Sequence, residues 1–149
     1  PVFIPINMLA TDDLLAKYNI HPGDILDCLG YPFGFESPIG SFPILRSGKI
    51  ASYPLLPTKD TRSFLLDFRV FPGNSGGPVY ISFTGDRFYD NAIGGMSFQF
   101  VMGLVSEEIK MVEKGKFQYS SFTQDTPLGL AKVIHASLIR ETITLLPPP

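Results

Sequence analysis

One glycine-rich turn constrains this chain more than any other feature of its sequence. It comprises Gly73-Asn74-Ser75-Gly76-Gly77-Pro78, with β-type apolar residues directly before and after it. Glycine adopts positive φ and lets other backbone groups approach without a Cβ clash, so the run predicts a tight turn between strands. Such a turn can point the Ser75 hydroxyl outward while the N–H groups of Gly73 and Ser75 converge. That geometry suits acyl transfer, although a hairpin with a solvent-exposed serine has the same composition.

The turn resembles the nucleophile loop of chymotrypsin-like serine peptidases. Their pattern is Gly-Asp-Ser-Gly-Gly-Pro, or Gly-Asn-Ser-Gly-Gly-Pro in the bacterial HtrA-like branch, and all six positions match the second form. The resemblance implies an antiparallel β-barrel, a polypeptide substrate, Ser75 as nucleophile, and the N–H groups of Gly73 and Ser75 as the oxyanion hole. Asn74 replaces the Asp that pairs with a freed N-terminal amine in trypsin-type zymogens, so we expect no activation by N-terminal cleavage.

Further segments extend this resemblance over most of the chain. Pro22–Ile25, Leu29–Gly34 and Ser47–Ser52 resemble strands and turns of the same family. Met102–Ser106 resembles the strand that walls the primary specificity pocket, and a substrate would pair there by strand addition. The implied substrate-binding residues are Gly103, Leu104, Val105 and Ser106.

The resemblance is weak over one segment and ambiguous at one residue. Between Ser82 and Gln99 the sequence fits the family poorly, and we expect an inserted hairpin or a long loop there. Arg69 stands six residues before Ser75, where trypsin-like enzymes often place the residue at the pocket floor. It is interpreted either as a pocket residue or as a surface residue of the preceding strand.

The resemblance also implies that the catalytic base lies outside this sequence. The family triad occurs in the order His, Asp, Ser, and its Asp precedes a segment of the type Val2–Ile6. We therefore expect residues 1–149 to be the C-terminal part of a peptidase domain, lacking the first barrel and inactive alone. His21 lies in a turn. His135 lies in a stretch with helical spacing and is interpreted as a surface or boundary residue. We therefore expect neither histidine to be the base. Asp12 and Asp13 follow Thr11 as acids in a capped first helical turn.

Composition excludes several function classes. The net charge of −2 gives no clustered cations for nucleic acid, and no apolar run is long enough to span a membrane. No pair of Cys or His has metal-ligand spacing, so we expect neither a metal nor a cofactor. Cys28 is the single cysteine, predicted to be a small core residue. Because it cannot form an internal disulfide, we expect a cytoplasmic or periplasmic bacterial protein.

The hydrophobic pattern predicts an all-β fold, a closed antiparallel barrel with a C-terminal helix. Predicted helices cover Thr11–Tyr18 and Val133–Ile143, and Glu107–Glu113 is either a short helix or the start of a loop. Predicted strands cover Val2–Ile6, Ile25–Gly30, part of Phe42–Tyr53, Ser63–Arg69, Pro78–Phe83, Phe98–Ser106 and Leu128–Val133.

Two functions from different classes follow from these observations. The first is a serine endopeptidase domain, and the second is a non-catalytic trypsin-like domain that binds proteins through the same turn and strand. In both cases we expect an exposed apolar face, leading to self-association or to pairing with the missing N-terminal barrel.

Overall fold

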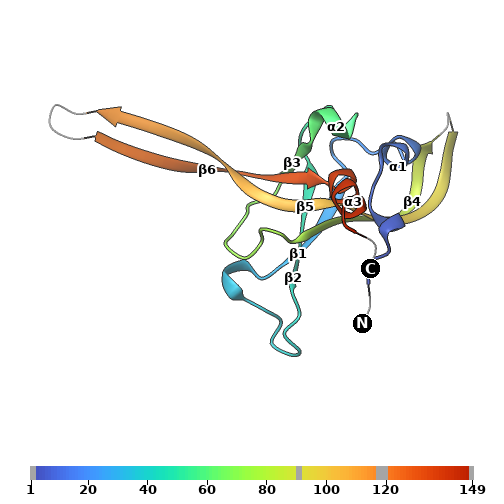
Figure 1. The fold of residues 1–149 in the computed structure, drawn as a ribbon, viewed down its shortest axis with the longest axis horizontal. Helices are drawn as coiled ribbons and strands as arrows, with labels where there is room; N and C mark the ends of the chain where they lie inside the picture. The colour runs from blue at the N-terminus through green and yellow to red at the C-terminus, as the bar shows by residue number, and fades with distance from the viewer. Residues whose placement is uncertain (1–2, 90–91, 117–120, 148–149) are drawn as a thin grey trace.

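Six antiparallel strands form a closed ring in this protein (Figure 1). The computed structural model describes residues 3–89, 92–116 and 121–147. Neighbours around the ring follow the order β1-β2-β3-β6-β5-β4, and β4 pairs with β1 to close it. Since β4 returns beside β1 after three consecutive strands, the first four strands make a Greek key. The strands are β1 (Ile25–Gly30), β2 (Ile44–Ile50), β3 (Ser63–Asp67), β4 (Pro78–Tyr89), β5 (Ala92–Lys116) and β6 (Ser121–His135).

The predicted all-β architecture with a C-terminal helix is confirmed, and each predicted strand from residue 25 onward lies on an observed one. The poorly fitting stretch from Ser82 to Gln99 is a hairpin, in which β4 pairs with β5. The predicted strand over Val2–Ile6 is wrong where it can be seen, because the chain forms the 3-10 turn η1 (Ile6–Met8) instead. Pro5 accepts the hydrogen bond from the Met8 N–H at 2.9 Å, which starts this turn; Val2 lies outside the described residues.

The helices follow local sequence signals. Helix α1 (Asp12–Lys17) begins after Thr11, whose hydroxyl accepts a hydrogen bond from the Leu14 N–H at 3.4 Å, as its capping pattern predicted. Helix α3 (Ala136–Thr144) begins three residues later than predicted, because β6 keeps the segment up to His135 extended. The short α2 (Thr58–Thr61) and η2 (Pro32–Gly34) carry too few residues for a periodic signal and were not predicted.

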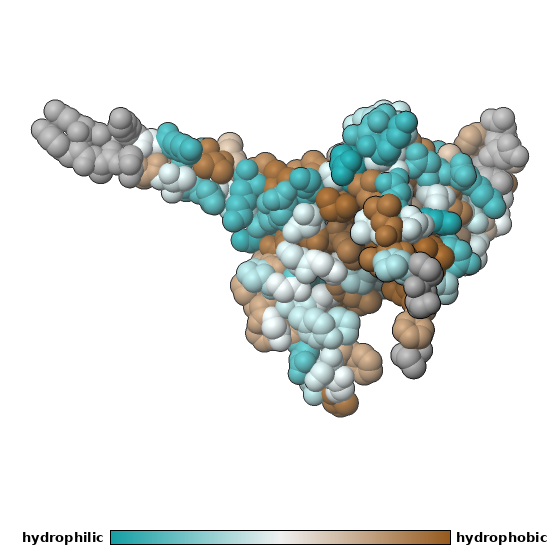
Figure 2. Space-filling view, viewed as in Figure 1, coloured by the Kyte–Doolittle hydropathy of each residue, from teal (hydrophilic) through white to brown (hydrophobic). Residues whose placement is uncertain are grey.

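The core fills the ring with side chains from every strand. Phe64, Leu66, Val79, Met102 and Val133 are among its fully buried members. Cys28 is also buried, as predicted. On the face seen in Figure 2, apolar side chains gather around α3, whereas hydrophilic side chains cover α2.

The outer ends of β5 and β6 project from the ring as a two-stranded arm (Figure 1). Pairing continues from Lys110 opposite Pro127 to Lys116 opposite Ser121, beyond the last contact of β6 with β3. The interpretation of Glu107–Glu113 as a short helix or loop is therefore wrong, because these residues belong to β5. Charged and apolar side chains alternate only from Glu108 to Met111, the period-2 pattern expected of a strand.

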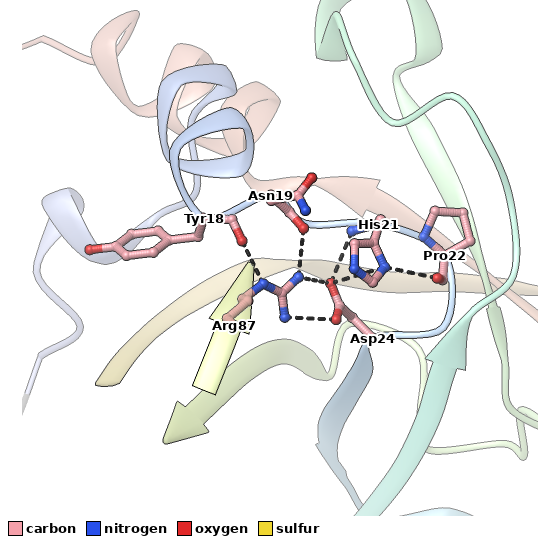
Figure 3. Close-up of polar contacts among 6 residues, drawn as sticks. All are labelled: Tyr18, Asn19, His21, Pro22, Asp24 and Arg87. Atoms are coloured by element: carbon pink, nitrogen blue, oxygen red, sulfur yellow. Dashed lines mark hydrogen bonds and ion pairs between the residues drawn. The ribbon is translucent and has the colours of Figure 1, made fainter. Parts of the chain in front are cut away.

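A buried arginine ties the β4–β5 hairpin to the start of the ring (Figure 3). Arg87 on β4 donates to both carboxylate oxygens of Asp24, at 2.8 and 2.5 Å. It also donates to the carbonyl oxygens of Tyr18 and Asn19, at 2.7 and 2.6 Å. A charge buried this far from water needs such partners, so Arg87 fixes the end of α1 against β1 and β4.

Candidate functional site

Two consecutive β-turns carry Ser75 between β3 and β4. In the first, the Asn74 N–H donates to the Phe71 carbonyl at 2.9 Å, and Pro72 and Gly73 occupy the central positions. In the second, the Gly77 N–H donates to the Asn74 carbonyl at 2.9 Å. Gly73 and Gly76 have φ of 93° and 80°, at the third position of each turn. A positive φ at that position alone identifies type II turns, so Ser75 occupies the exposed second position of the second turn.

The glycines of this loop are required by close backbone neighbours as well as by φ. A Cβ atom on Gly73 would overlap the carbonyl oxygen of Tyr31, and one on Gly77 would overlap that of Leu29. The loop therefore packs its backbone directly against the end of β1. The Tyr31 N–H donates to the Gly73 carbonyl at 3.0 Å, which fixes the height of the loop above the ring.

Asn74 anchors the loop from below. Its side chain is buried, with 1 % of the residue's surface exposed. Its Oδ1 accepts a hydrogen bond from the Phe71 N–H at 2.9 Å and a longer one from Arg46 at 3.4 Å. Arg46 stacks over the rings of Phe68 and Phe71, at 4.3 and 4.8 Å from the centroids. The neutral Asn74 acceptor inside the loop therefore lies beside the Arg46 cation.

Ser75 is exposed, and two hydrogen-bond donors beside it are free. Among the described residues, neither the Gly73 N–H nor the Ser75 N–H donates to an acceptor. The turn geometry explains this, because a type II turn uses only the N–H of its fourth residue. The neighbouring Gly76 N–H is different, since it donates to the Val105 carbonyl at 2.8 Å. The sequence-predicted oxyanion donors are therefore available to a ligand at Ser75.

An open cavity of about 560 Å³ borders Ser75 on one side, and we call it the Ser75 cavity. Its walls come from the segment before the loop and from β5. A second hollow of about 330 Å³ lies on the other side of the loop, against Tyr31 and Pro43. The residues that line the Ser75 cavity are Val70, Phe71, Pro72, Ser75, Ser106, Glu107, Glu108, Ile109 and Lys110.

The predicted substrate strand divides into two parts. Gly103 and Leu104 pair with β4 on one side and with β6 on the other. Val105 pairs with β6, and it exchanges hydrogen bonds with Gly76 and Gly77 on its other side. Because these backbones are already paired, a substrate strand can add only from Ser106 onward. Ser106 is exposed, lines the Ser75 cavity and has no register partner on β6.

Neither histidine contacts Ser75 in the described part of the chain. The exposed His21 lies in the turn before β1, where its Nδ1 is 3.0 Å from the Pro22 carbonyl (Figure 3). His135 is buried, and its Nε2 lies 3.2 Å from the Thr61 hydroxyl near the beginning of β3. The sequence interpretation of His135 as a surface or boundary residue is wrong, because the residue ends β6 and faces the core.

Burial sets the chemistry of two further groups. It lowers the pKa of His135 from 6.5 to about 4, an effect that Asp12 partly opposes, so this imidazole is neutral near pH 7. It raises the pKa of the Cys28 thiol to about 11, which Arg46 partly offsets. Cys28 therefore stays protonated and is a poor nucleophile.

The remaining candidates are placed as follows. Arg69 is exposed and stacks on Phe71 at 5.4 Å, and it does not line the Ser75 cavity. Within the described residues, no group of three His, Cys, Asp or Glu side chains is arranged to hold a metal ion. No helix in the same residues is long and apolar enough to cross a membrane. Comparison of the chain with protein-family models, curated proteins and solved structures found no match in any of the three.

Proposed function

We propose that this chain is the nucleophile-bearing part of a trypsin-like serine endopeptidase, with Ser75 as the nucleophile. One observation carries the proposal: an exposed serine hydroxyl stands beside two N–H donors that have no acceptor of their own. Both donors belong to a loop that the buried Asn74 side chain holds in place. The closed ring of antiparallel strands and the C-terminal helix are consistent with the chymotrypsin-like fold that the resemblance implies.

The reaction assigns one role to each part of the loop. Ser75 Oγ attacks the carbonyl carbon of a peptide bond as its proton passes to a general base. The Gly73 and Ser75 N–H groups then bind the oxyanion, and each such donor contributes about 3 kcal/mol to the transition state. The leaving amine departs with a proton and water releases the acyl group. The cavities on the two sides of Ser75 suit the residues on the two sides of the cleaved bond.

In this proposal the general base comes from outside the described residues. A base must reach Ser75 Oγ at hydrogen-bond distance, and neither His21 nor His135 makes that contact. A histidine elsewhere in the same polypeptide, or in a partner chain, fits the proposal. The 149-residue chain by itself should therefore show no peptide hydrolysis above background.

The test uses the natural protein that contains this chain. A fluorophosphonate probe should label it on Ser75, and Ser75→Ala should abolish both labelling and peptide cleavage without changing the melting temperature. Ser82→Ala is the matched control, because Ser82 is exposed on β4 away from the loop. Full activity in the Ser75→Ala protein would end the assignment. Serine-dependent cleavage by the 149-residue chain would show that one of its own histidines is the base.

The second candidate is a non-catalytic domain that binds peptides at the same place. The absence of a base in contact with Ser75 among the described residues favours it. Its signature would be peptide binding at the Ser75 loop in a natural protein that neither reacts with the probe nor cleaves peptides.

A further inference from the structure

The arm formed by the outer ends of β5 and β6 leaves one edge of β5 open. β4 pairs with β5 only as far as Leu104, and Val105 exchanges hydrogen bonds with the Ser75 loop. From Glu107 to Lys116, β5 pairs with β6 alone among the described residues. Every second residue of such an edge strand presents its N–H and C=O groups to the open side. The edge therefore offers a row of free backbone donors and acceptors.

The arm is also a structure that a third strand would stabilise. It projects from the ring (Figure 1), and it continues beyond the last contact of β6 with β3. Met111 and Val112 are 47 % and 54 % exposed, and as neighbours on a strand they lie on opposite faces. A two-stranded ribbon is marginally stable alone, and a third strand that adds apolar contacts stabilises it.

One face of β5 in the arm is positively charged. No register shift interrupts β5 beyond Lys110, so Lys110, Val112 and Lys114 lie on the same face. Lys110 lies 3.9 Å from Asp125 in an exposed ion pair. Lys114 is exposed and forms no ion pair within the described part of the chain. Opposite charges that face one another across two strands stabilise the pair, so an added strand fits best with acidic residues opposite both lysines.

An extended polypeptide is the occupant that suits this edge. Free backbone groups on an edge strand are recognised by a second backbone in the β conformation. Two lysines bordered by Glu113 and Asp125 are too few cations, and too mixed in sign, for a phosphate backbone. The Ser75 cavity follows the same edge, because Ser106 to Lys110 line it. A strand that begins in the cavity can therefore continue along the arm.

We propose that the β5 edge of the arm binds an acidic, extended segment of the polypeptide held at Ser75. The segment adds antiparallel to β5, with an apolar residue opposite Val112 and acidic residues opposite Lys110 and Lys114. Its sequence pattern is acidic, any, apolar, any, acidic. This inference rests on the proposed function, since the polypeptide is the one that Ser75 cleaves. The two lysines contact neither the scissile bond nor Ser75 Oγ, and so they determine only which polypeptides bind.

Peptide binding to the natural protein with Ser75→Ala tests the site, because this variant leaves the peptides uncleaved. The probe is a fluorescein-labelled peptide with the core Glu-Thr-Val-Thr-Glu between serines, and fluorescence anisotropy measures its affinity. The neutral core Gln-Thr-Val-Thr-Gln should bind about tenfold more weakly, because it lacks both ion pairs. The isomer Thr-Glu-Val-Glu-Thr keeps the charge but moves it to the other face of the strand. It should bind at least about threefold more weakly than the probe.

Two lysine variants locate the site on the protein. Lys114→Gln should weaken probe binding by about threefold and leave the neutral peptide unaffected. Lys59→Gln is the matched control, because Lys59 is exposed on α2, outside the arm, and its loss changes the net charge equally. It should leave probe affinity unchanged. Should Lys114→Gln fail to fold, the comparison of the three peptides decides.

Each outcome supports or overturns the inference. Equal binding of the probe and the neutral peptide, or probe binding unaffected by Lys114→Gln, would overturn it. Equal binding of the probe and its isomer would also do so, because attraction between charges would then suffice without strand pairing. A dimer that Lys114→Gln dissociates, without any probe binding, would assign the edge to a second copy of the chain instead. Probe binding without Ser75-dependent cleavage would remove the proposed function but keep the arm site, and Ser75-dependent cleavage without probe binding would do the reverse.

Discussion

Replacing Asn74 by alanine should loosen the Ser75 loop, because this one side chain closes the first of its two turns from inside. The substitution removes the acceptor of the Phe71 N–H, at 2.9 Å, and a weaker contact to Arg46 at 3.4 Å. A shielded donor left without a partner costs about 1–3 kcal/mol. Phe71 is half-buried, so we expect a loss of about 2 kcal/mol in the free energy of unfolding.

Urea denaturation followed by circular dichroism measures this loss. With a urea slope of roughly 2 kcal/mol per M for a domain of this size, the midpoint should fall by about 1 M. The Phe71 amide should also exchange its hydrogen faster than in wild type. Asn7→Ala is the matched control, because Asn7 is exposed and makes no side-chain hydrogen bond in the described structure, and its midpoint should not move. An Asn74→Ala midpoint equal to that of the control would refute the anchoring role.

Two further predictions concern the scaffold. Arg87→Met leaves the Asp24 carboxylate buried without the arginine that pairs with it, and should lower the free energy of unfolding by about 3–5 kcal/mol in the same assay. Lys110→Met, which breaks an exposed ion pair, should lower it by less than about 1 kcal/mol. Equal losses in the two variants would contradict this account. Burial gives His135 a folded-state pKa of about 4, below its ordinary value of 6.5. Its contribution to the free energy of unfolding is therefore fully present above pH 6.5. As the pH falls toward 4, this contribution of up to about 3 kcal/mol is lost. His135→Gln should flatten the stability profile between pH 6.5 and 5, and an unchanged slope there would show that His135 does not cause it.

The sequence was sufficient for features that depend on neighbours along the chain. The Gly73–Pro78 run predicted the turn because positive φ at fixed positions is a local property of glycine. Thr11 predicted the start of α1 for the same reason, since capping involves residues three apart. Strand β1 was predicted with its observed ends, because a turn signal precedes it and another follows it.

Errors arose where a residue's environment is set by distant strands. His135 follows a helix-like spacing, yet pairing of β6 with β3 and β5 extends it and buries it against Phe64. The Glu107–Glu113 stretch has an ambiguous composition, and only its pairing with β6 makes it part of the arm. Gly103 to Val105 were among the residues predicted to pair with a substrate strand. Their backbones already pair with β6 on one side, and with β4 or the Ser75 loop on the other, so no strand can be added there.

The sequence by itself therefore determined the turn that presents Ser75, the strand-rich character and the capped first helix. Tertiary structure decided the closing of the ring between β1 and β4, the free donors at Gly73 and Ser75, and the orientation of Glu108. The physical reason is that φ preferences and capping act within a few residues. Register, bulges and burial instead depend on which strand lies opposite, and a shift of one residue exchanges the two faces. The single unpaired Ser106 is enough to place Glu107 opposite Lys132 and Glu108 opposite the buried Ala131.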